Sequence, residues 1–318
     1  MLPDVPVTPD TIFFGASTTK AFTGAAASLL VDDNENYPEV QWTTPIARLI
    51  PDDFVLHDDY WTPRITIQDA LSHRTGLPAH RMAYDGKNST PKDLTRALRH
   101  LPFSSEPRTK FQYCNLMYVV ICHVIETMTG TWLGDLLKQR IWGPLGMTST
   151  FFHLNDVLKS GKQLAKGYEW NVEKGGFDAV QWPPILGDGA AGIFSNVLDY
   201  AKWIRSMINQ DGPLSPAGYK AVTTPYTIQG DDVPGHSDLL YSYGWILASY
   251  HGERVFSHTG GLEGFNSEVI FLPDRKWGAV LLANTNPSGI SAIEKLRYHL
   301  IDELLQIPTR DRHDWDAR

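Results

Sequence analysis

The chain has little cysteine, no excess of basic residues and no long apolar run. Only two of its 318 residues are cysteines, Cys114 and Cys122, which are too few for a disulfide scaffold. The formal net charge is −8, so the protein lacks the surplus of cations with which proteins neutralise nucleic-acid phosphates or anionic membranes. No run of about 18 apolar residues occurs, as a membrane-spanning helix would need. These absences argue against a disulfide-rich domain and against nucleic-acid or membrane partners.

Two further absences bear on location and on metals. The first residues, MLPDVP, contain neither the basic nor the apolar segment of a signal peptide. Together with the low cysteine content, this predicts a reducing, cytoplasmic compartment. The histidines His73, His80, His153 and His251 do not have the spacing of metal ligands, so we expect no metal site.

The remaining composition is that of a globular protein with a buried core. Hydrophobic residues make up 42% of the chain and charged residues 20%. Apolar patterning predicts helices at about 17–31, 66–71, 91–101, 115–129, 131–141 and 196–208. After Tyr241, four β-rich runs separated by turn residues predict an antiparallel meander, and a helix at 288–305 follows.

This order of elements predicts an α+β fold formed by residues 1–318 as a single catalytic unit. A mostly helical region, at about 60–210, is expected beside a sheet region at about 241–285. The helices at 17–31 and 288–305 are expected to pack on that sheet, and a cleft between the two regions is the default position for a site.

The first motif with chemical content is Ser17-Thr18-Thr19-Lys20. Residues three apart on a helix share a face, so the Lys20 amine can reach the Ser17 hydroxyl and activate it as a nucleophile. Taken alone, the motif is more often a solvated helix face, and Ser17 is equally suited to cap a helix.

Two later motifs supply the other groups that acyl transfer needs. Tyr113 and Asn115 can share one side of a turn, with the phenol as a proton shuttle and the amide as a hydrogen-bond donor. His258-Thr259-Gly260-Gly261 follows a β-rich run, where a backbone N–H can help to form an oxyanion hole. Separately, each motif has an ordinary structural explanation, as a buried tyrosine or a strand-to-turn junction.

The three motifs together, in this order, resemble the serine β-lactamase-related superfamily and its penicillin-binding-protein relatives. The similarity is strongest to class C β-lactamases, D-aminopeptidases and family VIII esterases, especially fungal members. It covers nearly the whole chain and includes the segments FGASTTK (14–20), LSHRTGLP (71–78), PLGM (144–147), AAGIFS (190–195) and YGW (243–245).

The resemblance implies a role for each motif. Ser17 would be the nucleophile, Lys20 and Tyr113 would carry its proton, and the N–H groups of Ser17 and Gly261 would form the oxyanion hole. Asn115 would contact the acyl side chain. No metal or organic cofactor is needed for this chemistry. Further residues expected to contact a substrate in the cleft are Thr259, Gly260, Trp245 and Phe265. Trp182 and Tyr241 could also line the cleft, although simple packing is the more common role for each of these four aromatic residues.

Two features depart from the family pattern. His258 replaces the lysine that many relatives carry, and a neutral imidazole attracts a substrate carboxylate less strongly than an ammonium group does. The histidine therefore either takes part in catalysis or only hydrogen-bonds within the cleft wall. Ser17 also lies near the start of the chain, so the first hairpin of the sheet is expected to be missing, and the exposed edge would permit a homodimer.

Three functions fit these observations. The leading hypothesis is an esterase or amidase that acts on a small, uncharged acyl substrate through an acyl-enzyme. The second is an acyltransferase or transesterase of secondary metabolism. The third is a non-acylating biosynthetic enzyme or an inactive binding protein that retains the fold.

Overall fold

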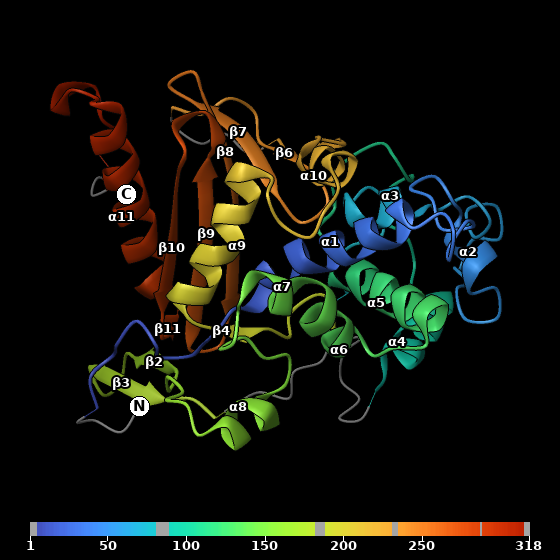
Figure 1. The fold of residues 1–318 in the computed structure, drawn as a ribbon, viewed down its shortest axis with the longest axis horizontal. Helices are drawn as coiled ribbons and strands as arrows, with labels where there is room; N and C mark the ends of the chain where they lie inside the picture. Colours follow the sequence, from blue (N-terminus) through green and yellow to red (C-terminus); the bar gives the residue numbers. More distant parts are fainter. Residues whose placement is uncertain (1–4, 81–88, 182–187, 231–234, 287, 315–318) are drawn as a thin grey trace.

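The computed structural model describes residues 5–80, 89–181, 188–230, 235–286 and 288–314. Their helices and strands form two regions that lie side by side (Figure 1). One region is a six-stranded antiparallel sheet flanked by α9 (Val197–Asn209) and α11 (Ser288–Leu305). The other is a helical region built around α1 (Thr19–Asp32) and α5 (Asn115–Thr129). The α+β fold expected from the order of elements is therefore confirmed.

The shorter helices complete the helical region and its connections. Thr66 and Thr90 each begin a helix with a capping box, in which an aspartate three residues later bonds back to the threonine N–H. The remaining helices are α2 (Ile46–Leu49), α3 (Ile67–Leu71), α4 (Pro91–Ala97), α6 (Leu133–Leu137), α7 (Gly143–Leu145), α8 (Leu154–Ser160) and α10 (Pro216–Thr223).

The large sheet has the strand order β10-β9-β8-β7-β6-β5. All its neighbouring strands are antiparallel, and β8 and β9 form the longest hairpin, closing at the pair Leu262 and Phe265. The bounds are β5 (Thr227–Ile228), β6 (Leu240–Tyr241), β7 (Ile246–Tyr250), β8 (Glu253–Leu262), β9 (Phe265–Leu272) and β10 (Trp277–Ala283).

Two small sheets lie beside the large one. β1 (Phe13–Phe14) pairs with β4 (Phe194–Ser195), and β11 (Thr285–Asn286) pairs with the hairpin of β2 (Tyr168–Asn171) and β3 (Gly176–Ala179). The N-terminal strand β1 thus lies outside the large sheet. Among the described residues, β10 pairs only with β9 and forms one edge of the large sheet, while β5 forms the other.

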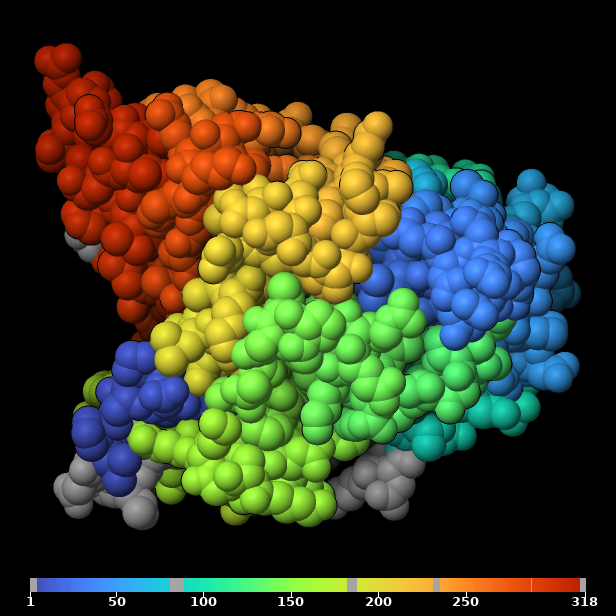
Figure 2. Space-filling model, viewed as in Figure 1, coloured from blue at the N-terminus to red at the C-terminus, as the bar shows by residue number. Residues whose placement is uncertain are grey.

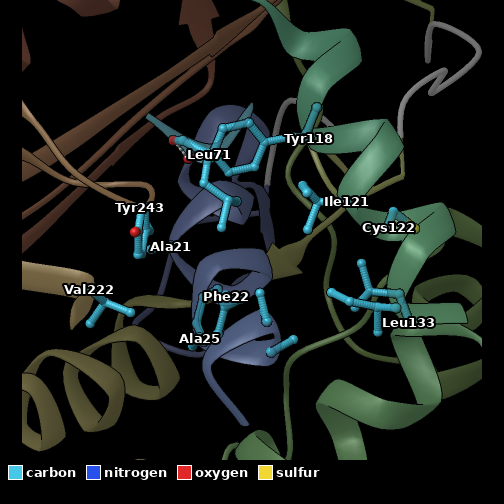
Figure 3. Close-up of a cluster of buried hydrophobic side chains, with 14 of the residues drawn as sticks. Ala21, Phe22, Ala25, Leu71, Tyr118, Ile121, Cys122, Leu133, Val222 and Tyr243 are labelled. Atoms are coloured by element: carbon cyan, nitrogen blue, oxygen red, sulfur yellow. Dashed lines mark hydrogen bonds between the residues drawn. The ribbon is translucent and has the colours of Figure 1, made fainter. Parts of the chain in front are cut away.

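Helix α1 passes through the middle of the molecule. Every residue from Thr19 to Val31 is buried, and Figure 3 shows the helix between α5 and α10. Phe22 stacks on Trp203 of α9 with ring centroids 4.7 Å apart. A Cβ at Gly24 would lie 2.3 Å from the carbonyl oxygen of Tyr243, so only glycine permits this close approach. The start of α1 is consequently held in a fixed position by both regions.

The surface view also shows that the chain passes from one end of the molecule to the other through α1. In Figure 2 the first described residues, in dark blue, lie below the sheet, while the residues that follow α1 cover the opposite end of the molecule. Among the described residues no single helix is long and apolar enough to cross a membrane; the bent pair Asn115–Thr129 and Leu133–Leu145 meets that test only jointly.

Several local expectations need adjustment. The helix expected at 131–141 consists of α6, a π-helical turn at Lys138–Trp142 and α7, because Pro144 has no N–H to continue an unbroken helix. Strand β8 does not end at its β-rich residues but continues through the glycines to Leu262. Helices α8 and α10 were not expected. Cys114 and Cys122 are buried free thiols.

Candidate active site

Ser17 lies in a 3₁₀ turn, Ala16–Thr18, directly before α1. The residue in front of it, Ala16, has a φ of +46°, an unfavourable conformation for a residue with a Cβ. Side-chain hydrogen bonds hold the turn in place: Thr18 donates to the carbonyl of Gly15 at 2.8 Å, and Thr19 donates to that of Ala16 at 2.6 Å. The small polar residues around Ser17 therefore fix the backbone of the turn.

Lys20 is fully buried one turn after Ser17. Its Nζ lies 3.1 Å from the Ser17 Oγ and donates a hydrogen bond of 2.9 Å to the carbonyl of Ala190. Burial lowers the pKa of this amine well below its usual range, although the nearby Cys114 thiol opposes the shift. A neutral amine in this position can accept the Ser17 proton, which an ammonium group cannot.

Tyr113 covers the Lys20 amine, whose Nζ lies 4.8 Å from the centre of the phenol ring. Burial raises the pKa of Tyr113, and a hydrogen bond with Ser17 partly offsets that effect. The phenol therefore stays protonated at neutral pH. This arrangement assigns the base to Lys20 and leaves Tyr113 to pass a proton onward.

Strand β8 approaches Ser17 from the sheet side. A Cβ at Gly260 would lie 3.1 Å from the Ser17 nitrogen and 2.3 Å from the carbonyl oxygen of Gly15, so a side chain has no room there. Ser267 of β9 binds the same Gly15 carbonyl at 2.7 Å. These contacts bring the backbone of β8 beside the backbone N–H of Ser17, where the oxyanion hole is predicted.

A cavity of about 340 Å³ opens over these groups. It is lined by Ser17 and by residues from four other segments of the chain. Its lining residues are Ser17, Phe111, Tyr113, Gln229, Tyr241, Ile246, His258, Thr259 and Gly261. The structure thus brings together six of the residues named from the sequence, Ser17, Tyr113, Tyr241, His258, Thr259 and Gly261, and the Lys20 amine lies beside Ser17.

Both ring nitrogens of His258 have partners. Nε2 lies 2.9 Å from the Tyr241 hydroxyl, and Nδ1 lies 2.7 Å from the Thr259 carbonyl. Since a carbonyl only accepts, Nδ1 carries the proton and Tyr241 donates to Nε2. Burial and the nearby Lys20 amine lower the pKa of His258 to about 3. The histidine is therefore a neutral part of the cleft wall, and this geometry does not support proton transfer by its ring.

Asn115 begins α5 two residues after Tyr113. Its Oδ1 atom is buried and has no hydrogen-bond partner among the described residues. A buried acceptor without a partner is costly, so this amide is ready to receive an N–H from a ligand. A role in contacting the substrate remains the prediction for Asn115.

Two predicted substrate-contacting residues belong to the core instead. Trp245 is completely buried and packs edge-on against Phe271 at 5.1 Å. Phe265 is 1% exposed and packs against Phe14 at 6.3 Å. The expected contact of these two residues with substrate is wrong, because both side chains pack within the core and do not line the cavity at Ser17. Trp182 lies outside the described residues.

One residue that sequence reasoning did not assign to the site is His73. It is fully buried with a φ of +56°, and its ring lies 4.3 Å from that of Tyr113. Its Nδ1 accepts a hydrogen bond of 3.1 Å from the N–H of Cys114, and its carbonyl accepts one of 2.7 Å from the N–H of Gln112. Both neighbours of Tyr113 are thus tied to His73, which acts as a positioning residue. The sequence feature that could have pointed to His73 is its position in the segment LSHRTGLP, which is part of the family resemblance.

The family model described as Beta-lactamase matches residues 3–302. The chain is 44% identical over 323 residues to the unguisins hydrolase ungD′ of Aspergillus campestris, covering 99% of this chain and 60% of that protein. It is 40% identical over 337 residues to the unguisins hydrolase ungD of Aspergillus violaceofuscus, covering 98% and 59%, respectively. The chain therefore spans about three fifths of the length of these curated relatives.

Solved structures share the fold at lower identity. The octameric penicillin-binding protein homologue of Pyrococcus abyssi has a TM-score of 0.76 and 24% identity, covering 92% of this chain and 68% of that one. The D-amino acid amidase of Ochrobactrum anthropi SV3 has a TM-score of 0.76 and 23% identity, covering 95% and 85%, respectively. These similarities establish the fold.

The state of the Lys20 amine can be read from how stability depends on pH. An unfolded chain holds this proton up to about pH 10.5, whereas burial releases it at lower pH in the folded protein. Between those two pH values the unfolded state binds more protons, so stability rises with pH, by at most about 1.4 kcal/mol per unit. We expect Lys20→Met to lose this rise, as measured by urea unfolding at several pH values. Parallel pH curves for the two proteins would contradict a neutral amine.

A pair of substitutions tests the positioning role of His73. In His73→Asn, the side-chain oxygen can still accept the Cys114 N–H, and asparagine tolerates a positive φ; His73→Leu does neither. We expect kcat on a p-nitrophenyl ester to fall roughly tenfold or more in the leucine variant, with little change in KM, and to be largely retained in the asparagine variant. Equal losses of kcat in both variants would rule out the hydrogen bond as the cause.

Proposed function

The chain belongs to the β-lactamase family, and from that premise we propose that it is a serine acyl-enzyme hydrolase. The family resemblance of the motifs is confirmed by the match over residues 3–302. The observation that carries the proposed activity is the 3.1 Å contact between the Ser17 hydroxyl and a buried Lys20 amine. The names of the Aspergillus relatives, both hydrolases, support hydrolysis.

In the proposed reaction, neutral Lys20 takes the Ser17 proton while Oγ forms a bond to the substrate carbonyl carbon. The resulting oxyanion accepts hydrogen bonds from the N–H groups of Ser17 and Gly261. As the tetrahedral intermediate collapses, the bond to the leaving nitrogen or oxygen breaks. The leaving atom takes a proton from Lys20 through the Tyr113 hydroxyl. Water then attacks the acyl-enzyme by the same steps in reverse, releasing the acid and freeing Ser17.

The charges around Ser17 favour an uncharged ester or amide. His258 is neutral, and the buried Lys20 amine is neutral when it acts as a base. Among the described residues that line it, the cavity therefore has no permanent cation to attract a carboxylate. Its volume of about 340 Å³ suits a small acyl group. We accordingly propose an esterase or amidase for small uncharged acyl substrates, and the unguisins named for the relatives are the first compounds to try.

Transfer to an alcohol or amine, as in a transesterase of secondary metabolism, would proceed through the same acyl-enzyme. The two activities differ only in whether water or an organic acceptor attacks it. The ratio of acid to transfer product, measured with increasing acceptor concentration, separates them. A non-acylating enzyme or an inactive protein that keeps the fold would not form the acyl-enzyme.

Ser17 is tested by intact-mass measurement after exposure to a fluorophosphonate or a p-nitrophenyl ester. We expect one covalent adduct per chain in the wild type and none in Ser17→Ala, because the other groups cannot replace the nucleophile. Ser160→Ala, a change at the exposed last residue of α8, is the matched control and should label fully. Normal turnover by Ser17→Ala would refute the acyl-enzyme mechanism.

We also propose that the chain associates through the edge of its sheet. β10 is regular, lacks charged residues over Trp277–Ala283, and has no strand on its outer side among the described residues. Such an edge readily pairs with another strand. Light scattering should give about twice the chain mass of 35.7 kDa, and Leu281→Lys on the edge should return a monomer. A wild-type monomer at high concentration would refute the dimer.

A further inference from the structure

A second cavity, of about 220 Å³, adjoins the one that contains Ser17. Thr259 and Gly261 line both cavities, so the two meet at β8. The β7 partner strand begins opposite Ser257 and leaves the later part of β8 without a neighbour on that side. A group bound at Ser17 can therefore reach across the open edge of β8 to the face of the sheet that α11 covers.

Strand alternation explains how this cavity forms. Gly261 and Thr259 pair with Asn266 and Glu268 of β9, and these four residues line the cavity on the α11 side. A Cβ at Gly261 would meet only the Asn266 side chain, at 3.3 Å, so the missing side chain leaves a hollow beside the predicted oxyanion hole. From α11, Ile290 and Ile293 supply apolar walls.

The cavity contains a cation whose charge is already balanced. Arg297 Nη1 lies 2.5 Å from a carboxylate oxygen of Glu268, with only 15% and 1% of the two side chains exposed. Arg297 Nη2 also lies 3.9 Å from Glu294. Two carboxylates therefore surround one guanidinium, and an additional anion would be repelled rather than attracted.

One nitrogen of the Arg297 guanidinium remains available to bind a ligand. The Nε atom of Arg297 is buried and has no hydrogen-bond partner among the described residues. It can donate one hydrogen bond to a neutral acceptor such as an amide carbonyl. Apolar walls with a buried donor that lacks a partner suit an uncharged side chain next to an amide, and they do not suit a terminal carboxylate.

The cavity adjoins the part of the site where the leaving group departs. Thr259 follows His258, whose ring centre lies 6.4 Å from that of Tyr113, the residue proposed to protonate the leaving atom. Because Tyr113 and Thr259 line the same cavity, a group bonded to that atom can extend past Thr259 into the hollow behind it. Asn115, assigned to the acyl side, does not line this cavity.

We infer that the cavity between β8 and α11 is a subsite for an apolar, uncharged group on the leaving side of the scissile bond. The inference rests on the proposed acyl-enzyme function. It implies that the preferred substrate is an internal amide or ester of a larger molecule, with no free carboxylate beside the bond that is broken.

Three thioesters of one acyl group test the subsite, because all three form the same acyl-enzyme and differ only in the thiol that leaves. The thiols are N-methyl-2-mercaptoacetamide, N-isobutyl-2-mercaptoacetamide and N-(2-mercaptoacetyl)glycine, which share the amide next to sulfur and so leave with similar ease, and the released thiol is measured directly. We expect kcat/KM for the neutral isobutyl amide to exceed that for the methyl amide about tenfold or more, as one filled apolar pocket provides. The thioester with the carboxylate should be the poorest substrate of the three.

Ile293→Trp should fill the cavity and bring the ratio of kcat/KM between the isobutyl amide and methyl amide thioesters close to one. Leu296→Trp, at an exposed position on the same helix outside the cavity, should keep the wild-type ratio. Because each ratio is taken within one protein, a partial folding defect does not alter it.

Several outcomes would overturn the subsite. These are a ratio near one in the wild type, a preference for the carboxylate, and an unchanged ratio in Ile293→Trp. If fluorophosphonate labels Ser17 and the thioesters are hydrolysed, these failures leave the acyl-enzyme function intact; absence of both reactions refutes that function itself.

Discussion

The site depends on one interaction, the hydrogen bond between a buried lysine amine and a serine hydroxyl one helical turn before it. Burying an amine is unfavourable unless the amine is neutral and its hydrogen bonds are satisfied. Here the Ala190 carbonyl and the Ser17 hydroxyl provide those partners at 2.9 and 3.1 Å. The burial that costs stability also lowers the pKa of Lys20, so the property that the proposed mechanism needs follows from the packing of α1 through the centre of the molecule.

The surrounding groups keep this environment free of other charges. Burial keeps His258 neutral between the Tyr241 hydroxyl and the Thr259 carbonyl, and Glu268 balances Arg297 on the opposite face of β8. Because charges act strongly at low dielectric, an unpaired cation in either place would attract anionic substrates. The neutral His258 and the paired Arg297 therefore favour an uncharged substrate, and burial remains the largest cause of the lowered Lys20 pKa.

The sequence alone predicted the bounds of those helices that carry strong local signals. α5 and α11 have the expected bounds, 115–129 and 288–305, because apolar periodicity and the following glycine or preceding turn residues mark their ends. Ser17 and Lys20 are near each other for a local reason, the pitch of one helical turn. What local pattern could not provide was long-range geometry: the Ala190 carbonyl, the Tyr241 hydroxyl and the His73 ring reach the site from distant segments. For the same reason Trp245 and Phe265, which are close to motif residues in sequence, proved to be core residues.

The most direct measurement is an NMR titration of the Lys20 side chain in protein labelled with ¹³C at lysine Cε, with Lys20→Met used to assign the signal. A resonance that titrates well below the ordinary lysine value of 10.5 is the predicted result. A Lys20 signal that remains that of an ammonium group through neutral pH and titrates near 10.5 would contradict the account.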